Sequence, residues 1–307
     1  MYLNAIIASM DKTLIIGSVH TDIIAEVKEL PKGNEDFKVN NTYETVGGSG
    51  FVSAEIFHLF GFPYELLAPV GTGVYGDKVQ ASMKEKGIPV ECYTPETDGC
   101  TYHLKDEEGN ESVIFVPGAE YSFDHSYTED LYPDEIDNLI VSGDLLAGDG
   151  ASDLLETIDD LGKTVYYILG ERIEDIPEEA HDALFKMHPV LYLNEEEAWY
   201  LSHEKEKDLQ KTSALLYQLT NSPVVIVKDG EGTYYYEKDQ SFLVPERKKI
   251  NTLFHCGAFV CARNAGASVR DALVLANAFA TANHGALPDE WDMRDIKQKL
   301  IDIITKK

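Results

Sequence analysis

The hydrophobic pattern of the chain alternates between short apolar runs and longer amphipathic stretches. A short apolar run between turn residues predicts a buried strand, and apolar residues at every third or fourth position predict a helix. Strands that alternate with helices predict a doubly wound, mainly parallel α/β sheet flanked by helices, and we expect residues 1–307 to form one domain. The predicted strands are 13–18, 63–70, 88–93, 138–142, 164–169, 190–194 and 224–228, and the predicted helices are a glycine-led helix within 46–61, then 77–86, 152–161 and 209–219.

Two extended segments interrupt this alternation, at about 24–46 and 99–118. The second contains a predicted hairpin, because residues 101–105 and 112–116 alternate in polarity around the turn sequence DEEGN. We expect the two segments to pair as a small β lid beside the main sheet. Such a lid has exposed edges, and a homodimer that forms through the lid would cover them. Near the end of the chain, a short antiparallel pair (233–237 and 241–244) precedes three predicted helices.

Composition narrows the classes of partner. The chain has 26 Lys and Arg residues against 54 Asp and Glu residues, with a net charge of -28. This charge repels phosphate backbones and anionic lipid surfaces, so we expect neither nucleic acid nor a membrane as a partner. We identify no signal peptide or transmembrane segment. The four cysteines show no metal-binding or disulfide spacing, which favours the cytoplasm.

A candidate ligand site lies just past the first predicted strand. Asp22 follows the strand that ends near Ser18, and open parallel sheets bind ligands at the carboxyl ends of their strands. A carboxylate can accept two hydroxyl hydrogen bonds, and glycine lets the backbone approach a sugar ring. We therefore predict that a small polyol binds between Asp22 and the turn at Gly47 and Gly48.

A second candidate site is the stretch from Asn251 to Gly266, where a turn enters an apolar helical pattern. The first amides of a helix and its dipole attract anions. Phosphoryl transfer at such a turn would require small residues, which let the backbone approach the charge, and a carboxylate just inside the helix. The chain has Phe254, His255, Cys256 and Gly257 instead.

These motifs together resemble the ribokinase/PfkB family of carbohydrate kinases, which act on sugars and nucleosides. The resemblance runs from about residue 14 to residue 300, and no single motif carries it alone. It implies a ribokinase-like fold, ATP and Mg²⁺ as cofactors of an active enzyme, and substrate contacts from Asp22 and the glycine turn. The motifs are Gly17, Ser18 and Asp22, then Gly47, Gly48 and Gly50, then Val70 to Asp77, and finally Asn194 with Glu197.

The resemblance also implies a nucleotide and phosphate side. In the family, an Asn-x-x-Glu pair organises magnesium and phosphate-bound water, so Glu197 is expected to act on the metal through water. The family's Gly-x-x-Gly segment is shortened here to Gly230-Glu231-Gly232. The residues that we assign to this side are Asn194, Glu197, Lys228, Gly230, Asn251, Thr252, Phe254 and Cys256.

The family's second signature, Asp-Thr-x-Gly-Ala-Gly-Asp, is altered in this chain. Phe254 and Cys256 replace its glycines, and Gly257 stands where the family has its catalytic base. Loss of a general base typically costs roughly 10²–10⁴ in rate, and loss of an oxyanion donor roughly 10²–10³. Val52 and Glu120 replace two further asparagines that are common in the family.

Three interpretations follow for the function. The first is a catalytically impaired homologue, a pseudokinase, that binds a small polyol, sugar or nucleoside. The second is an active ATP-dependent kinase with a non-standard base. His255 is the candidate, although it lies about 200° around a helix from the position of the lost base. The third is a dinucleotide-binding oxidoreductase, because Gly71 to Gly76 matches G-x-G-x-x-G after a predicted strand.

Each motif also has a purely structural interpretation. Asp22 is compatible with a turn or a helix cap, and the Gly47-Gly48 pair is compatible with a tight turn. Asn194 and Glu197 have the spacing of a helix capping box.

Overall fold

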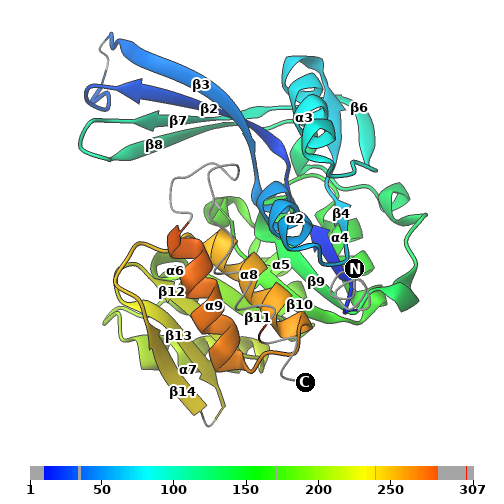
Figure 1. Cartoon of the computed structure of the whole chain (residues 1–307), viewed down its shortest axis with the longest axis vertical. Coiled ribbons are helices and arrows are strands. Elements are labelled where there is room, and N and C mark those ends of the chain that lie inside the picture. Colours follow the sequence, from blue (N-terminus) through cyan, green and yellow to red (C-terminus); the bar gives the residue numbers. More distant parts are fainter. Residues whose placement is uncertain (1–9, 34–35, 171, 239, 283–301, 303–307) are drawn as a thin grey trace.

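A sheet of eight strands forms the centre of the computed structural model (Figure 1), which describes residues 10–33, 36–170, 172–238, 240–282 and 302. Six neighbouring strands run parallel, and at one edge β13 runs antiparallel to β12 and β14 runs antiparallel to β13. In spatial order the strands are β14 (Gln240–Pro245), β13 (Gly232–Glu237), β12 (Val224–Lys228), β11 (Val190–Asn194), β10 (Thr164–Ile168), β9 (Asn138–Ser142), β1 (Thr13–Ile16) and β4 (Tyr64–Leu67).

Helices cover both faces of this sheet, because successive side chains of a strand point to opposite faces. Leu14 and Leu139 belong to one buried cluster, whereas Ile15 and Ile140 belong to the other. The predicted doubly wound fold is therefore confirmed. The Ile15 face packs against α2 (Ser49–Phe60), α8 (Thr252–Asn264) and α9 (Val269–Ala282), whereas α3 (Gly73–Lys86) belongs to the same cluster but contacts strands outside this sheet. The Leu14 face packs against α4 (Ala151–Leu161), α5 (Glu178–Phe185), α6 (Glu195–Ser202) and α7 (Leu209–Thr220).

A second, four-stranded sheet projects from the body of the molecule in Figure 1. Both extended segments that interrupt the sequence pattern contribute to it, and the predicted hairpin forms its β7 and β8. We call it the small sheet. Its strands, in spatial order, are β3 (Val39–Gly47), β2 (His20–Val27), β7 (Cys100–Lys105) and β8 (Glu111–Val116).

The structure corrects the prediction between residues 63 and 97. The single predicted strand 63–70 is two strands, β4 and the short β5 (Val70–Thr72). The predicted strand 88–93 is absent, and β6 (Tyr93–Thr97) pairs with β5 in a separate sheet. The apolar signal there comes from the end of α3, where the Ile88 amide donates to the Met83 carbonyl and the side chain is buried.

Other corrections concern helices. Helix α3 begins at Gly73, four residues before the predicted start at residue 77, and α5 was not predicted. Of the three helices expected to close the chain, the structure contains α8 and α9, and the region of the third lies outside the described residues. None of the described helices is long and apolar enough to cross a lipid bilayer.

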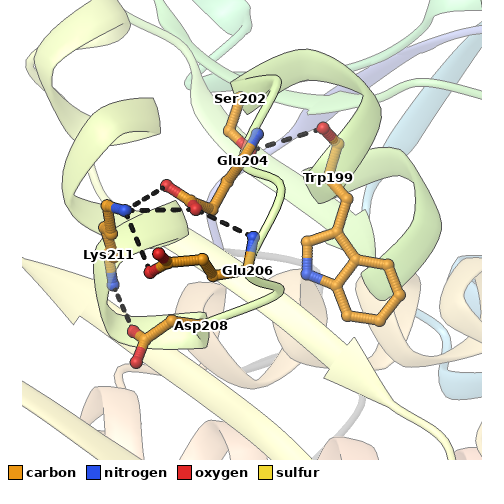
Figure 2. Close-up of polar contacts among 6 residues, drawn as sticks. All are labelled: Trp199, Ser202, Glu204, Glu206, Asp208 and Lys211. Atoms are coloured by element: carbon orange, nitrogen blue, oxygen red, sulfur yellow. Dashed lines mark hydrogen bonds and ion pairs between the residues drawn. The ribbon is translucent and has the colours of Figure 1, made fainter.

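Figure 2 shows the polar contacts that join α6 to α7. The Lys211 ammonium contacts Glu204 at 3.1 Å and Glu206 at 3.3 Å. Asp208 caps α7 by accepting the Lys211 amide at 2.8 Å, and the Ser202 hydroxyl bonds to the Trp199 carbonyl. These contacts fix the carboxyl end of α6, the helix that begins at the candidate phosphate side.

Candidate functional site

A cavity of about 430 Å³ lies where the small sheet meets the main domain. Its walls come from β2, the end of β3, the start of α2 and the start of α8. We call it the Asp22 pocket, because Asp22, Gly47 and Gly48 all line it. Asn251 and Phe254 line it as well, so the structure brings together residues from three separate motifs of the sequence.

The Asp22 carboxylate is a largely buried charge with two imidazole partners. Its Oδ1 lies 3.1 Å from Nε2 of His20 and 3.3 Å from Nε2 of His103. Burial alone would raise the pKa of Asp22, but the two histidines lower it to about 2. The carboxylate is therefore ionised at neutral pH and can accept hydroxyl hydrogen bonds.

Both histidines line the pocket, and the sequence analysis missed them. His20 lies two positions before Asp22 on β2, so the two side chains share a face of the strand. Burial lowers the pKa of His20, but hydrogen bonding to Asp22 outweighs this and the net shift is upward. His103 comes from β7, and its Nδ1 lies 2.8 Å from Oε1 of Glu111.

Two of the three glycines of the predicted turn, Gly47 and Gly48, line the Asp22 pocket. A β-carbon on Gly47 would lie 2.0 Å from Oδ2 of Asp22, so any side chain there would displace the carboxylate. Gly48 has a φ of +100° and is the N-cap of α2. Gly50 differs, because it packs against Gly17 and does not line the pocket.

The start of α8 is a capped helix start and not a turn that requires glycine. The helix begins at Thr252, and none of residues 252–257 has a positive φ. Asn251 caps it, with Oδ1 accepting the Phe254 amide at 3.1 Å and the carbonyl accepting the His255 amide at 2.9 Å. The side chains of Phe254 and Cys256 therefore do not strain a turn. Phe254 lines the Asp22 pocket, whereas Cys256 is fully buried and lines neither this pocket nor the phosphate side described below.

Gly257 is buried against α2. A β-carbon at this position would lie 2.8 Å from Cδ1 of Ile56, which is also fully buried. Ile56 thus occupies the space that the first atoms of an acidic side chain at position 257 would need. Gly257 does not line the Asp22 pocket.

His255 lies in the core and not in the pocket. It is fully buried, hydrogen-bonds to Tyr192 through Nδ1, and has Nε2 3.0 Å from Thr233 Oγ1 and 2.9 Å from Asn277 Oδ1. Burial lowers the pKa of His255 to about 3. This placement gives no support to His255 as a substitute base and corrects that suggestion.

The predicted phosphate side forms a second cavity, of about 570 Å³, lined by Asn194, Glu197, Asn251 and Thr252. Asn194 and Glu197 form a capping box at the start of α6. The Glu197 amide donates to Asn194 Oδ1 at 2.9 Å, and the Asn194 amide donates to Glu197 Oε2 at 2.6 Å. The structural interpretation of this pair therefore holds, and the pair also faces the cavity.

Magnesium prefers carboxylate and amide oxygens of this kind, usually with several waters. Glu197 and Asn194 would fit a metal held through water. Within the part of the chain that the structure describes, no group of three or more His, Cys, Asp or Glu side chains forms a ready metal site.

A groove of about 830 Å³ continues from this cavity toward the small sheet. Its cations are Lys105 and Lys249, neither of which was predicted. The predicted Lys228 lies beside the groove with its ammonium 3.0 Å from Glu195 and 3.2 Å from Glu231. Gly230 has a φ of +72° in the turn between β12 and β13 and does not line the groove.

Asp144 is a further pocket residue that the sequence analysis missed. It lies just past the carboxyl end of β9, is 6% exposed, and accepts the Ser142 hydroxyl at 2.9 Å. A β-carbon on Gly170 would lie 2.2 Å from Oδ1 of Asp144. Asp22 was identified because open parallel sheets bind ligands at the carboxyl ends of their strands. The same rule, applied to the strand 138–142, could have identified Asp144.

The G-x-G-x-x-G match does not lie at a dinucleotide site. Gly71 belongs to β5 and Gly73 begins α3, and among the described strands β5 pairs only with β6. The glycines therefore lie outside the eight-stranded sheet. A β-carbon on Gly76 would lie 2.4 Å from the Gly71 carbonyl oxygen, so these glycines serve a tight strand-to-helix contact.

Known proteins resemble this chain over nearly its whole length. Structures of ribokinases from Thermotoga maritima (TM-score 0.77, 18% identity, 95% of this chain and 99% of that one) and from Arabidopsis thaliana complexed with ribose and ATP (0.72, 17%, 96% and 99%) share the fold. The "Uncharacterized sugar kinase YegV" of Escherichia coli strain K12 is 23% identical over 285 residues, 90% of this chain and 89% of YegV. Residues 10–285 match the model of the pfkB family carbohydrate kinases. The family predicted from the sequence motifs is thus confirmed, and the chain belongs to the pfkB family of carbohydrate kinases.

Proposed function

We propose that this protein is a catalytically impaired pfkB homologue that binds a small polyol, sugar or nucleoside in the Asp22 pocket. The observation that carries the proposal is the contrast between two parts of the site. The Asp22 pocket is fully built, whereas position 257 holds a buried glycine packed against Ile56. In this proposal the residues that bind a ligand are present, whereas the residue that would act as the base in phosphoryl transfer is missing.

Ligand recognition in this proposal depends on an ionised carboxylate in a mostly enclosed place. His20 and His103 both contact Oδ1 of Asp22, and Gly47 leaves its Oδ2 oxygen close to bare backbone. A polyol offers adjacent hydroxyl donors that match these acceptors. The small sheet would act as a lid, since β2 and β7 supply Asp22 and His103 directly.

Phosphoryl transfer is expected to be impaired because the chain lacks the group that would position the nucleophile. In phosphoryl transfer the protein contributes mainly positioning and charge stabilisation, with a base that orients the attacking hydroxyl. Gly257 cannot supply that base, and His255 lies in the core. Two amides at the start of α8, those of Phe254 and His255, are also engaged, because both donate to Asn251.

The alternative is an active kinase with a non-standard base, which would use Mg²⁺ and ATP. One observation favours keeping it: Asp144 lines the same pocket as Asn251 at the start of α8. An active enzyme could therefore use the Asp144 carboxylate in place of the missing one. ADP release during incubation with Mg-ATP and a panel of sugars and nucleosides separates the two functions.

We predict that wild type releases ADP at least about 10²-fold more slowly than the 1–100 s⁻¹ usual for kinases.

Gly257→Asp should not restore turnover, and its clash with Ile56 should lower the free energy of unfolding by roughly 1–3 kcal/mol. Ile56→Ala with Gly257→Asp removes the clash and should release more ADP than the single variant. Ile56→Ala alone is the control. Turnover by wild type in the usual kinase range would contradict the proposal, and its loss in Asp144→Asn would then identify Asp144 as the base.

We also predict that Asp22→Asn weakens the binding of any sugar, polyol or nucleoside found for wild type. Loss of one charged hydrogen-bond acceptor costs roughly 1.5–3 kcal/mol, or about 10- to 100-fold in affinity. Isothermal titration calorimetry measures the change. The matched control is Asp160→Asn on the exposed side of α4, which should leave affinity unchanged. Equal affinity for wild type and Asp22→Asn would place the site elsewhere.

A homodimer through the small sheet is the third expectation. Its edge strands β3 and β8 carry exposed apolar side chains, among them Tyr43 at 47% and Ile114 at 50% exposure. Light scattering at high micromolar concentration should give twice the chain mass for wild type and the chain mass for Ile114→Lys. Val74→Lys, at an exposed apolar residue of α3, is the control and should stay dimeric. A monomeric wild type would refute this expectation.

A further inference from the structure

Two buried carboxylates lie at the root of the β7–β8 hairpin, and the function proposed above uses neither. Asp98 is 3% exposed and lies two residues before β7. Glu120 is 1% exposed and lies in a short 3-10 helix, Ala119–Tyr121, just after β8. Buried acids are costly unless they are paired or hydrogen-bonded, so each requires a structural explanation.

Glu120 ties the two ends of the hairpin together. Its Oε2 accepts the Gly99 amide at 2.8 Å, and its Oε1 accepts the Gly118 amide at 3.0 Å. The two backbones approach closely, since a β-carbon on Gly99 would lie 1.7 Å from the Val116 carbonyl oxygen. One carboxylate therefore holds both strands of the hairpin where they leave the main domain.

Asp98 ties the same root to the neighbouring β5. Its Oδ1 accepts the Gly71 amide at 2.7 Å, and its own amide donates to the Thr72 carbonyl at 3.1 Å. Among the described residues its buried Oδ2 has no hydrogen-bond partner. An ionised carboxylate would leave this oxygen charged and unsatisfied, whereas a protonated one would not carry that charge.

The charges around Asp98 come from two elements packed against it. Glu120 of the 3-10 helix repels an ionised Asp98, and His20 of β2 attracts it. His20 is itself engaged with Asp22 and lies in the field of Asp144. Burial is the largest influence, and together with Glu120 it raises the pKa of Asp98 to about 7.

We propose that Asp98 and Glu120 form a pH-sensitive clasp that positions the β7–β8 hairpin and releases it when Asp98 ionises. Neutral Asp98 lies beside Glu120 without repulsion, and the hairpin root stays closed. Ionised Asp98 places a negative charge beside Glu120, which repels it. The clasp also positions Tyr121, the neighbour of Glu120, which lines the Asp22 pocket. The clasp does not depend on what the pocket binds.

The sign of the pH effect follows from linkage. In an opened root Asp98 would titrate near its ordinary pKa of 3.8, and in the closed root near 7. The closed state therefore holds more protons between these values, so its stability falls as pH rises through that window. The opening equilibrium constant increases by at most about tenfold per pH unit, or roughly a hundredfold from pH 5 to pH 7. Above about pH 8 it is constant.

Hydrogen–deuterium exchange of the wild-type chain tests this without any ligand. Peptides within residues 99–118 are followed by mass spectrometry from pH 5 to pH 8, with exchange corrected for the intrinsic pH dependence of amides. The expected result is protection that falls severalfold or more between pH 5 and pH 7. A peptide that contains β9 in the central sheet is the internal reference and should not change in parallel.

Asp98→Asn is the matched variant, because the amide keeps the size of the side chain and cannot ionise. Its protection in residues 99–118 should be independent of pH, whereas Asp160→Asn should follow wild type. Corrected wild-type protection that does not change between pH 5 and pH 7 would overturn the proposal. An equal pH dependence of protection in Asp98→Asn would also overturn the proposal, because another group would then be titrating.

Discussion

The cost of burying the Asp22 charge determines how the pocket is built. A carboxylate removed from water requires partners of opposite charge or donors with good geometry. His20 and His103 supply these partners from two strands of the small sheet, and the missing side chain of Gly47 leaves room for the second oxygen. The small sheet, the glycine turn and the main domain therefore meet at one carboxylate. Its position connects the fold to the proposed ligand.

The second constraint is the packing of α8 against α2. Because Asn251 caps α8 and the helix begins at Thr252, Gly257 lies inside the helix and faces Ile56. A base at position 257 would need both a different residue and a shift of the Ile56 side chain. In this proposal, phosphoryl transfer is impaired by the packing of α8 against α2 as well as by the missing side chain at position 257.

Much of the fold could be predicted from the sequence, because continuous apolar runs mark strands buried on both faces. The predicted bounds of β9, β11 and β12 agree with the structure residue for residue. The prediction of a strand at residues 88–93 was wrong, because the apolar Ile88 belongs to the contact that ends α3. Local patterns identify buried residues but not always the element that buries them.

The site was less predictable, since part of it depends on pairing between distant strands. Asp22 and the glycine turn have local signals, but His103 reaches Asp22 only through the register of β2 and β7, in which Asp22 lies opposite Thr101. The exact start of α8 was not predicted, although the N-cap signal of Asn251 was in the sequence. Gly257 facing Ile56 is a tertiary contact with no local signal.

The measurement that tests the central claim most directly is a melting-temperature screen of sugars, polyols and nucleosides, each with and without Mg-ATP. A ligand that binds the folded state raises the melting temperature, and the shift grows with the logarithm of its concentration relative to its Kd. The account predicts that at least one such compound stabilises the wild-type protein without Mg-ATP. Stabilisation by Mg-ATP alone, with no response to any compound of the panel, would contradict it.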